Sequence, residues 1–266
     1  MSDARFELDA DTALLEIGPG RYRGEITDRW TVAAGPNGCY VAALMLRGVL
    51  IESTLPDPLT MTVHYLSRPA VGYCEVQVET LRIGRGHTTL ECRLLQDGEI
   101  RAVGLVTLGR LREAGAHDFS PARREMALPP EDATVLRERE MPAPLWDRLD
   151  LRVGSPEDVF FLRSEPGSPE TGGWTRLADG RPTDALCVPL FLDCWPPAVF
   201  SRTMSPSLTG APTIELTVHW RNRVGPQWHF THFETRLVAG GYMDESGELW
   251  SADGRLVAES RQLARW

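Results

Sequence analysis

The sequence predicts an α+β protein made of two tandem copies of one small fold. The segment TVHYLSRPA, beginning at Thr62, is matched without a gap by TVHWRNRVG, beginning at Thr217. A second pair of similar segments, DGEIRAVGLVTL and DGRLVAESRQLA, follows in the same order at nearly the same spacing. The period is too long for a solenoid repeat, so a duplicated domain is the better interpretation. We expect an N-terminal copy at residues 1–112, a linker at 113–150 and a C-terminal copy at 151–266.

The first copy begins with short strand-like pieces at residues 21–30, followed by a Gly-Pro-Asn-Gly turn in which Asn37 has the residue type of a helix N-cap. From Cys39 to Ile51 the chain is apolar around nearly its whole circumference, which predicts a helix that other structure must enclose. Gly and Asp-Gly breaks then separate four alternating segments, which predict antiparallel hairpins. These segments are TMTVHYLSRP, YCEVQVETLRIG, HTTLECRLLQDG and EIRAVGLVTLGRL.

The second copy repeats this order. ALCVPLFLDCWPPAVF supplies its helical region, and four strand segments follow: TIELTVHWR, HFTHFETRLVA, GYMDESGELWSADG and RLVAESRQLARW. A sheet curled around one apolar helix is the hotdog arrangement, so the predicted fold class is a double hotdog, in which each antiparallel sheet wraps a long central helix. The linker between the copies is rich in Pro, Ala and alternating charge, as expected of a solvated connection, and we expect a short helix at residues 131–140.

Composition excludes several classes of function. The net charge of −9 describes an acidic surface, which repels phosphate backbones, so we expect no nucleic-acid partner. All 28 basic residues are Arg, which excludes a Schiff-base or Walker lysine. The longest apolar run is too short to span a bilayer, and the first ten residues lack an apolar signal core, so we expect a cytoplasmic protein. The five cysteines show no CxxC spacing; we expect buried, reduced thiols and no metal site.

On these residues the sequence resembles the double-hotdog acyl-CoA thioesterases of the acyl-CoA thioesterase II type, and most closely their actinobacterial thioesterase-like branch. The resemblance lies in the duplication, the PNG turn, the HYLSRP motif and the DG…VA…Q pattern of the last strand, and it covers nearly the whole chain outside the linker. It implies hydrolysis of a fatty acyl-CoA to the free fatty acid and CoA. It implies no cofactor besides the CoA thioester substrate itself, and a homo-oligomer of double-hotdog units.

Two polar residues of the second copy occupy positions where the first copy is apolar. Gln262 aligns with Val106 and falls on the apolar face of the last strand, where a buried amide needs hydrogen-bond partners. A Gln that merely pins the strand to the helix is the alternative. Thr213 aligns with Pro58, and strict alternation places it on the face of Glu215. Threonine is common in strands for packing reasons alone.

A third candidate, Asp193, interrupts the apolar stretch PLFLDCWPPAVF just before Pro196 and Pro197. Two prolines end or restart a helix, so we expect Asp193 at an interruption whose free backbone amides keep the carboxylate ionised. A plain N-cap is the alternative interpretation.

The resemblance implies roles for these residues. An Asp, a Thr and a Gln of the family map onto Asp193, Thr213 and Gln262, where they would hold a water, with Asp193 as general base. The oxyanion would meet backbone N–H groups at Asn37 and Gly38, or at the start of the second helix. Arginines would bind the CoA diphosphate, and the candidates are Arg68, Arg82 and Arg223.

Two other functions stay open. The sequence has no GxSxG, HExxH, SxxK or Walker motif. His64 and His219 occupy equivalent positions, which favours a structural role, but a hotdog hydratase or dehydratase would pair such a His with a carboxylate, and Glu215 lies nearby. A non-catalytic acyl-CoA-binding protein is the third hypothesis, although such a protein has no reason to keep three polar residues in an apolar cleft.

Overall fold

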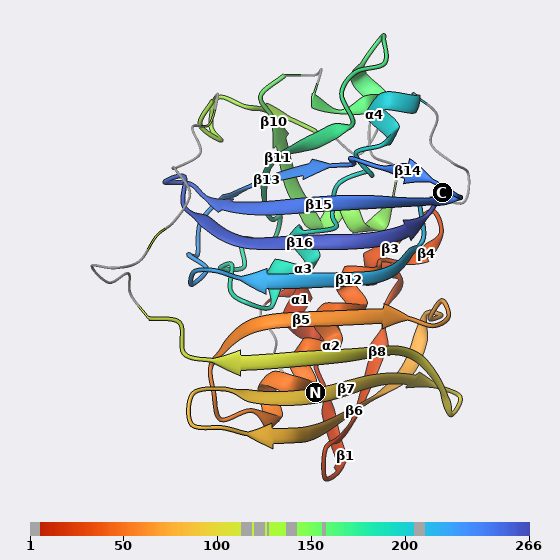
Figure 1. Ribbon diagram of the computed structural model, residues 1–266, viewed down its shortest axis with the longest axis vertical. Coiled ribbons are helices and arrows are strands. Elements are labelled where there is room, and N and C mark those ends of the chain that lie inside the picture. Colours follow the sequence, from red (N-terminus) through yellow and green to blue (C-terminus); the bar gives the residue numbers. More distant parts are fainter. Residues whose placement is uncertain are drawn as a thin grey trace.

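A computed structural model describes residues 6–112, 119, 126, 128–136, 143–155, 158–204 and 211–266. Within these residues one large antiparallel sheet dominates the molecule, and the few helices lie behind it (Figure 1). The sheet has fourteen strands in the order β1-β2-β6-β7-β8-β5-β12-β16-β15-β13-β11-β10-β9, with β14 beside β15. A two-stranded sheet, β3 (Thr31–Val32) with β4 (Gly35–Pro36), precedes the main helix.

The predicted strand segments are confirmed in both halves of the chain. The first half contributes β1 (Leu15–Gly18), β2 (Arg21–Ile26), β5 (Asp57–Tyr65), β6 (Gly72–Ile83), β7 (Thr88–Gln96) and β8 (Glu99–Gly109). The second contributes β9 (Thr134–Val135), β10 (Leu149–Val153), β11 (Glu170–Leu177), β12 (Thr213–Trp220), β13 (His229–Glu234), β14 (Val238–Ala239), β15 (Tyr242–Ser251) and β16 (Leu256–Arg265). The expected helix at residues 131–140 is wrong in its described part, which forms turns and β9, while residues 137–140 lie outside the described residues.

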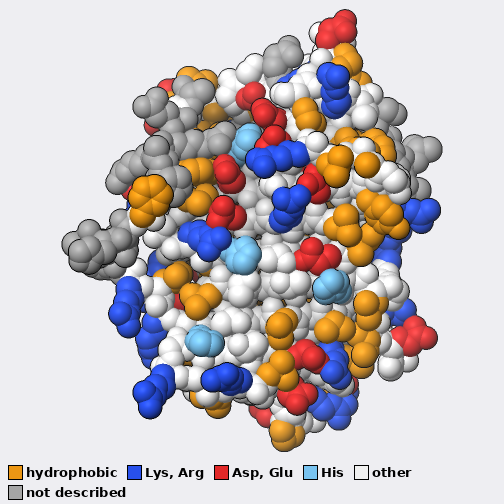
Figure 2. All heavy atoms as spheres, in the orientation of Figure 1, with side chains coloured by type: hydrophobic (Ala, Val, Ile, Leu, Met, Phe, Trp, Pro, Cys, Tyr) orange, Lys and Arg blue, Asp and Glu red, His pale blue; other side chains and the backbone are white. Residues whose placement is uncertain are grey.

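The two similar segments that begin at Thr62 and Thr217 lie side by side in β5 and β12, which pair antiparallel and join the two halves of the sheet. Thr62 is directly opposite Thr217, and their hydroxyl oxygens are 2.9 Å apart. His64 is opposite Glu215, and His219 is opposite Thr60, all on the outer face of the sheet. Figure 2 shows this face, where acidic, basic and histidine side chains are interspersed.

The helix α2 (Gly38–Glu52) is enclosed as predicted. Ten of its 15 residues are buried, and it packs against β6, β7 and β8. Each fully buried Leu or Met contributes about 1.5–3 kcal/mol to folding, so the helix is the centre of this core. The N-cap prediction is also confirmed, because Asn37 Oδ1 accepts hydrogen bonds from the N–H groups of Cys39 (3.0 Å) and Tyr40 (2.9 Å).

The expectation of a long second helix is wrong. The corresponding region forms only α3 (Cys187–Phe191) and α4 (Phe200–Thr203), with a turn and an irregular segment between them. The two prolines, Pro196 and Pro197, lack the N–H groups that a continuous helix would need, and their rings clash with the preceding turn. The predicted interruption at Asp193 is therefore confirmed, and it lets a polar side chain enter an apolar region.

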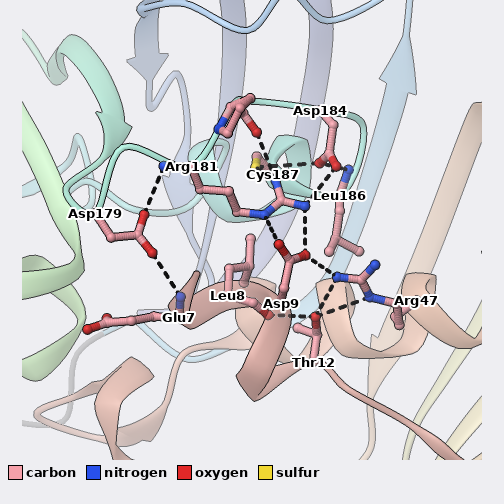
Figure 3. Close-up of polar contacts among 11 residues, drawn as sticks. Glu7, Leu8, Asp9, Thr12, Arg47, Asp179, Arg181, Asp184, Leu186 and Cys187 are labelled. Atoms are coloured by element: carbon pink, nitrogen blue, oxygen red, sulfur yellow. Dashed lines mark hydrogen bonds and ion pairs between the residues drawn. The ribbon is translucent and has the colours of Figure 1, made fainter. Parts of the chain in front are cut away.

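Short helices complete the fold: α1 (Glu7–Asp11), η1 (Asp28–Trp30), η2 (Pro144–Arg148) and η4 (Phe160–Leu162). A polar cluster fastens α1 to α2 and to the loop before α3 (Figure 3). The Asp9 carboxylate accepts hydrogen bonds from Arg181 at 2.9 Å and from Arg47 at 2.7 Å. Burial tends to raise the pKa of Asp9, but the bonds from Arg181 and Arg47 outweigh it and hold the pKa below its usual value. This cluster explains the single charged side chain within the apolar run of α2.

All five cysteines are buried with free thiols, as predicted. No described helix has the length and the apolar character needed to cross a membrane.

Candidate active site

A cavity of about 1,120 Å³ lies where the N-terminus of α2 faces the segment between α3 and α4 and the beginning of β12. Much of its wall is aromatic: Trp146, Phe160, Phe161, Trp195, Phe200, Tyr242 and Trp266. Its polar wall includes Asn37, Asp193 and Thr213, and two arginines, Arg68 and Arg265, also border it. An apolar cavity with a few convergent polar groups is the usual form of a small-molecule site.

Asp193 follows α3 and is half-buried at the cavity wall. Asn37 Nδ2 donates to its Oδ2 at 3.0 Å and to its carbonyl oxygen at 3.3 Å. Because Asn37 Oδ1 already accepts from the helix N-terminus, the orientation of this amide is fixed, with Nδ2 directed at the carboxylate. One side chain therefore links the start of α2 to Asp193.

Burial raises the pKa of Asp193 to about 6, while hydrogen bonds from Asn37, Cys39 and Gln262 act in the opposite direction. The carboxylate is therefore mostly ionised at neutral pH, yet basic enough to accept a proton. We expected free backbone N–H groups at the proline interruption to donate to the Asp193 carboxylate, but the structure has a different donor. The N–H of Asp193 itself donates to the Leu190 carbonyl oxygen, and the carboxylate accepts from the side chain of Asn37, the N-cap of α2.

Gln262 lies on the buried face of β16, as predicted, and it connects two side chains. Thr213 Oγ1 donates to Gln262 Oε1 at 2.8 Å, and Gln262 Nε2 donates to Glu245 Oε1 at 2.9 Å. Glu245 Oε2 also accepts the N–H of Ala198 at 2.6 Å. The structure thus brings Asp193, Thr213 and Gln262 together, and it adds a fourth polar residue.

Glu245 was missed by the sequence reasoning, although β15 carries a signal for it. Met243, Glu245, Gly247 and Leu249 alternate with more exposed residues and are all buried, so the period-2 pattern directs this carboxylate inward. Burial and, to a smaller extent, the charge of Asp193 raise the pKa of Glu245 to about 7, against hydrogen bonds from Ala198 and Gln262. Two buried carboxylates thus lie on either side of one amide.

The predicted face of Thr213 is wrong, and a β-bulge is the reason. Thr213 pairs with Ala264 of β16 while Glu215 pairs with Leu263, so one extra residue, Ile214, is accommodated between them. The bulge reverses the alternation before it. Thr213 therefore shares the inner face of Ala264 and Gln262, whereas Glu215 faces outward.

The backbone donors expected for an oxyanion are only partly free. The N–H of Asn37 donates to Trp30 O at 2.9 Å, so this group is not available, and that prediction is wrong. The start of α3 does not border the cavity, and its Cys187 N–H donates to Asp184. Gly38, the first residue of α2, does border the cavity, and no acceptor among the described residues is paired with its N–H. A Cβ at Gly38 would lie 3.3 Å from the Tyr65 ring, so a larger residue fits poorly.

The remaining candidates separate by position. Arg68 is exposed at the cavity border, whereas Arg82 and Arg223 do not border the cavity, and Arg223 pairs with Asp57 at 3.4 Å. Neither His64 nor His219 borders it, and no described histidine does. The hydratase or dehydratase alternative therefore lacks its expected histidine in the described part of this cavity.

Comparison with known proteins identifies the family of the chain. Residues 26–109 match the family model of the acyl-CoA thioesterase N-terminal domain, and residues 126–265 match that of the acyl-CoA thioesterase C-terminal domain. No curated protein sequence matches the chain.

Solved structures give the same picture. A candidate thioesterase II from Thermobifida fusca YX has a TM-score of 0.88 and 27% identity, covering 98% of this chain and 97% of that one. A conserved hot dog protein of unknown function from Alicyclobacillus acidocaldarius has a TM-score of 0.84 and 25% identity, covering 97% of each chain. The acyl-CoA thioesterase II TesB2 of Mycobacterium marinum, at 17% identity, a TM-score of 0.69 and 97% coverage of each chain, shares the fold. The chain therefore belongs to the acyl-CoA thioesterase family and is a thioester hydrolase with a hotdog fold.

Proposed function

We propose that the protein hydrolyses fatty acyl-CoA to the free fatty acid and CoA through a water held by Asp193, Thr213 and Gln262. The observation that carries this proposal is the meeting of these three side chains beside an aromatic cavity. Asp193 has a pKa of about 6 there, because burial raises it, while Asn37, which donates to the carboxylate at 3.0 Å, and Gln262 lower it. Thr213 donates to the Gln262 amide.

In the proposed reaction Asp193 accepts a proton from the water as the water oxygen adds to the thioester carbonyl carbon. The carbonyl oxygen gains negative charge, and the N–H of Gly38 is the proposed donor to it, assisted by the positive end of α2. The tetrahedral intermediate then collapses, the C–S bond breaks, and the proton on Asp193 passes to the departing CoA thiolate. The carboxylate is thereby regenerated, and no covalent acyl-enzyme is formed.

Substrate binding divides between the apolar and the charged walls. The aromatic part of the cavity would take the fatty acyl chain, because its burial there removes apolar surface from water. Arg68 at the border is the proposed partner of the CoA diphosphate, and Arg265 offers a second guanidinium on the same cavity. CoA remains the substrate's own leaving group, and the proposed chemistry uses no other cofactor.

The finer description of the fold is also a proposal. We infer that the two halves are copies of one hotdog unit, which is supported by the antiparallel pairing of β5 with β12 at Thr62 and Thr217. We further propose that these double-hotdog units associate as a homo-oligomer, and light scattering after gel filtration would measure its mass.

The first experiment measures thiol release from acyl-CoAs of increasing chain length. We expect release by the parent protein and a loss of kcat of about 100- to 10,000-fold in Asp193→Asn, because a general base of this kind contributes about that factor. Asp253→Asn, at an exposed turn, is the matched control and should keep the parent rate. Absence of thiol from every substrate would refute the proposed function. The non-catalytic alternative would then be tested by equilibrium binding of the same acyl-CoAs.

A further inference from the structure

The second buried carboxylate of the site, Glu245, has no role in the proposed reaction as described so far. Only 5% of its surface is exposed, and it lies on β15 directly opposite Gln262 of β16. Its two oxygens have separate partners, Gln262 Nε2 at 2.9 Å and the Ala198 N–H at 2.6 Å. A buried acidic residue with two well-placed donors is not explained by packing.

The contacts of Glu245 determine which way the Gln262 amide faces. An ionised carboxylate can only accept hydrogen bonds, so Gln262 must present its NH₂ group to Glu245. Its Oε1 then faces Thr213, whose hydroxyl donates to it at 2.8 Å. With its proton committed in this way, the Thr213 oxygen keeps its lone pairs free to accept from a water in the cavity.

The same orientation serves Asp193. The NH₂ group of an amide has two hydrogens, and Glu245 takes only one of them, so the second is left for the water or for Asp193, whose pKa Gln262 lowers. If the amide were reversed, its Oε1 would face the Glu245 carboxylate, and Thr213 would meet an NH₂ group. In its ionised form Glu245 therefore excludes the reversed amide, and the Ala198 N–H holds Glu245 in place from the segment that follows Asp193.

We propose that Glu245 is a positioning residue of the hydrolytic site, which fixes the Gln262 amide so that Thr213, Gln262 and Asp193 address one water. This inference rests on the proposed function for its kinetic consequence, but the orientation itself is independent of turnover. The titratable group that acts on Glu245 through its charge is Asp193, across the cavity wall. Its other neighbours on β16 and before α4 are an amide and a backbone N–H.

The kinetic test uses Glu245→Gln, which preserves shape but can present an NH₂ group to Gln262 and so permits the reversed amide. We expect kcat for thiol release to fall about 10- to 100-fold, with KM within about twofold, because the orienting effect is greatest in the transition state. Since burial raises the pKa of Glu245 to about 7, the parent pH profile should contain two ionisations, that of Asp193 near pH 6 and that of Glu245 near pH 7, and Glu245→Gln should keep only the first. The matched control is Glu248→Gln, on the same strand but more exposed.

A second readout does not depend on activity. In ¹⁵N-labelled protein the side-chain NH₂ signal of Gln262, assigned by its loss in Gln262→Leu, should show a transition near pH 7 in the parent that is absent from Glu245→Gln, where only the transition of Asp193 near pH 6 remains. A parent profile and amide titration retained in Glu245→Gln would overturn the proposal. If the parent releases no thiol, the proposed function fails, and the amide titration still decides whether Glu245 orients Gln262.

Discussion

The two halves of the sheet have the same strand register but different side chains at the site. In the second half Glu245 is opposite Gln262, and in the first half Leu90 is opposite Val106 at the same place in the ladder. Both members of the apolar pair are fully buried. The comparison teaches that the backbone places two facing side chains at this point in both halves. Only the second half carries polar side chains there, so only that half can form a hydrogen-bonded site.

The irregularities of the strands also correspond. A bulge follows Thr213 on β12, and another follows Pro58 on β5. The first half thus has an inward-facing position at the beginning of its central strand, but a proline there offers no hydroxyl. The asymmetry of the site therefore comes from side chains and from the broken second helix, not from the sheet.

Among the changes that compare the two halves, the largest effect is expected when the second half is given the side chains of the first. In Glu245→Leu/Gln262→Val we expect kcat to fall about 1,000-fold, equivalent to about 4 kcal/mol, because the water loses its oriented partners. Urea unfolding of the double and single variants measures the coupling between the two residues. We expect the double variant to be about 1–3 kcal/mol more stable than the sum of the single changes allows, since the singles each leave a buried group without its partner. Strict additivity would contradict a direct Glu245–Gln262 interaction.

The second-largest expected effect is on the pH dependence of the unfolding free energy, to which only the second half contributes buried carboxyl groups at this site. A carboxyl whose pKa is higher in the folded than in the unfolded chain binds more protons when folded, so its stabilising effect is complete below the unfolded pKa and is lost as pH rises through the folded one. Burial raises the pKa of Asp193 to about 6 and that of Glu245 to about 7. The parent protein should therefore lose stability between pH 5 and pH 8, by about 2–3 kcal/mol from Glu245 alone.

The apolar pair of the first half makes no such contribution. Glu245→Leu should accordingly show a flatter dependence of unfolding free energy on pH than the parent, measured by urea unfolding at both pH values. Equal slopes in the two proteins would mean that Glu245 titrates normally in the fold.

The smallest expected effect concerns the bulged position. Thr213→Val keeps the shape but removes the hydroxyl that the first half also lacks at Pro58. We expect kcat to fall about tenfold with KM nearly unchanged, because Gln262 retains its bond to Glu245 while one partner of the water is lost. Steady-state kinetics provide the measurement, and an unchanged kcat would place Thr213 outside the reaction.

The sequence predicted the strands, the enclosed helix and its N-cap, because alternation, apolar periodicity and turn residues are local signals. Gln262 was also placed on the correct face by alternation alone. Thr213 was not, because a bulge depends on pairing with a neighbouring strand. The occupied N–H of Asn37 depends on Trp30, seven residues away. The interruption of the second helix was predicted from its two prolines, but the short length of α3 was not, because the apolar character of the region continues on both sides of Asp193. Glu245 was missed because charged residues occupy both faces of β15, with Asp244 and Glu248 on the other face, and the alternation of Met243 and Leu249 alone was not used to choose between them.

Asn37 combines two tasks in one amide, and this restricts what can replace it. Serine, threonine and aspartate are good residues for beginning a helix. Aspartate would cap α2 but would place a second negative charge against Asp193, and the hydroxyl of serine or threonine is too short to serve the helix and the carboxylate in the same way. The start of α2 and the acidity of the site therefore cannot vary independently. A substitution chosen only to strengthen the helix would also change the hydrogen bonding and the pKa of Asp193, so at this position stability and activity change together.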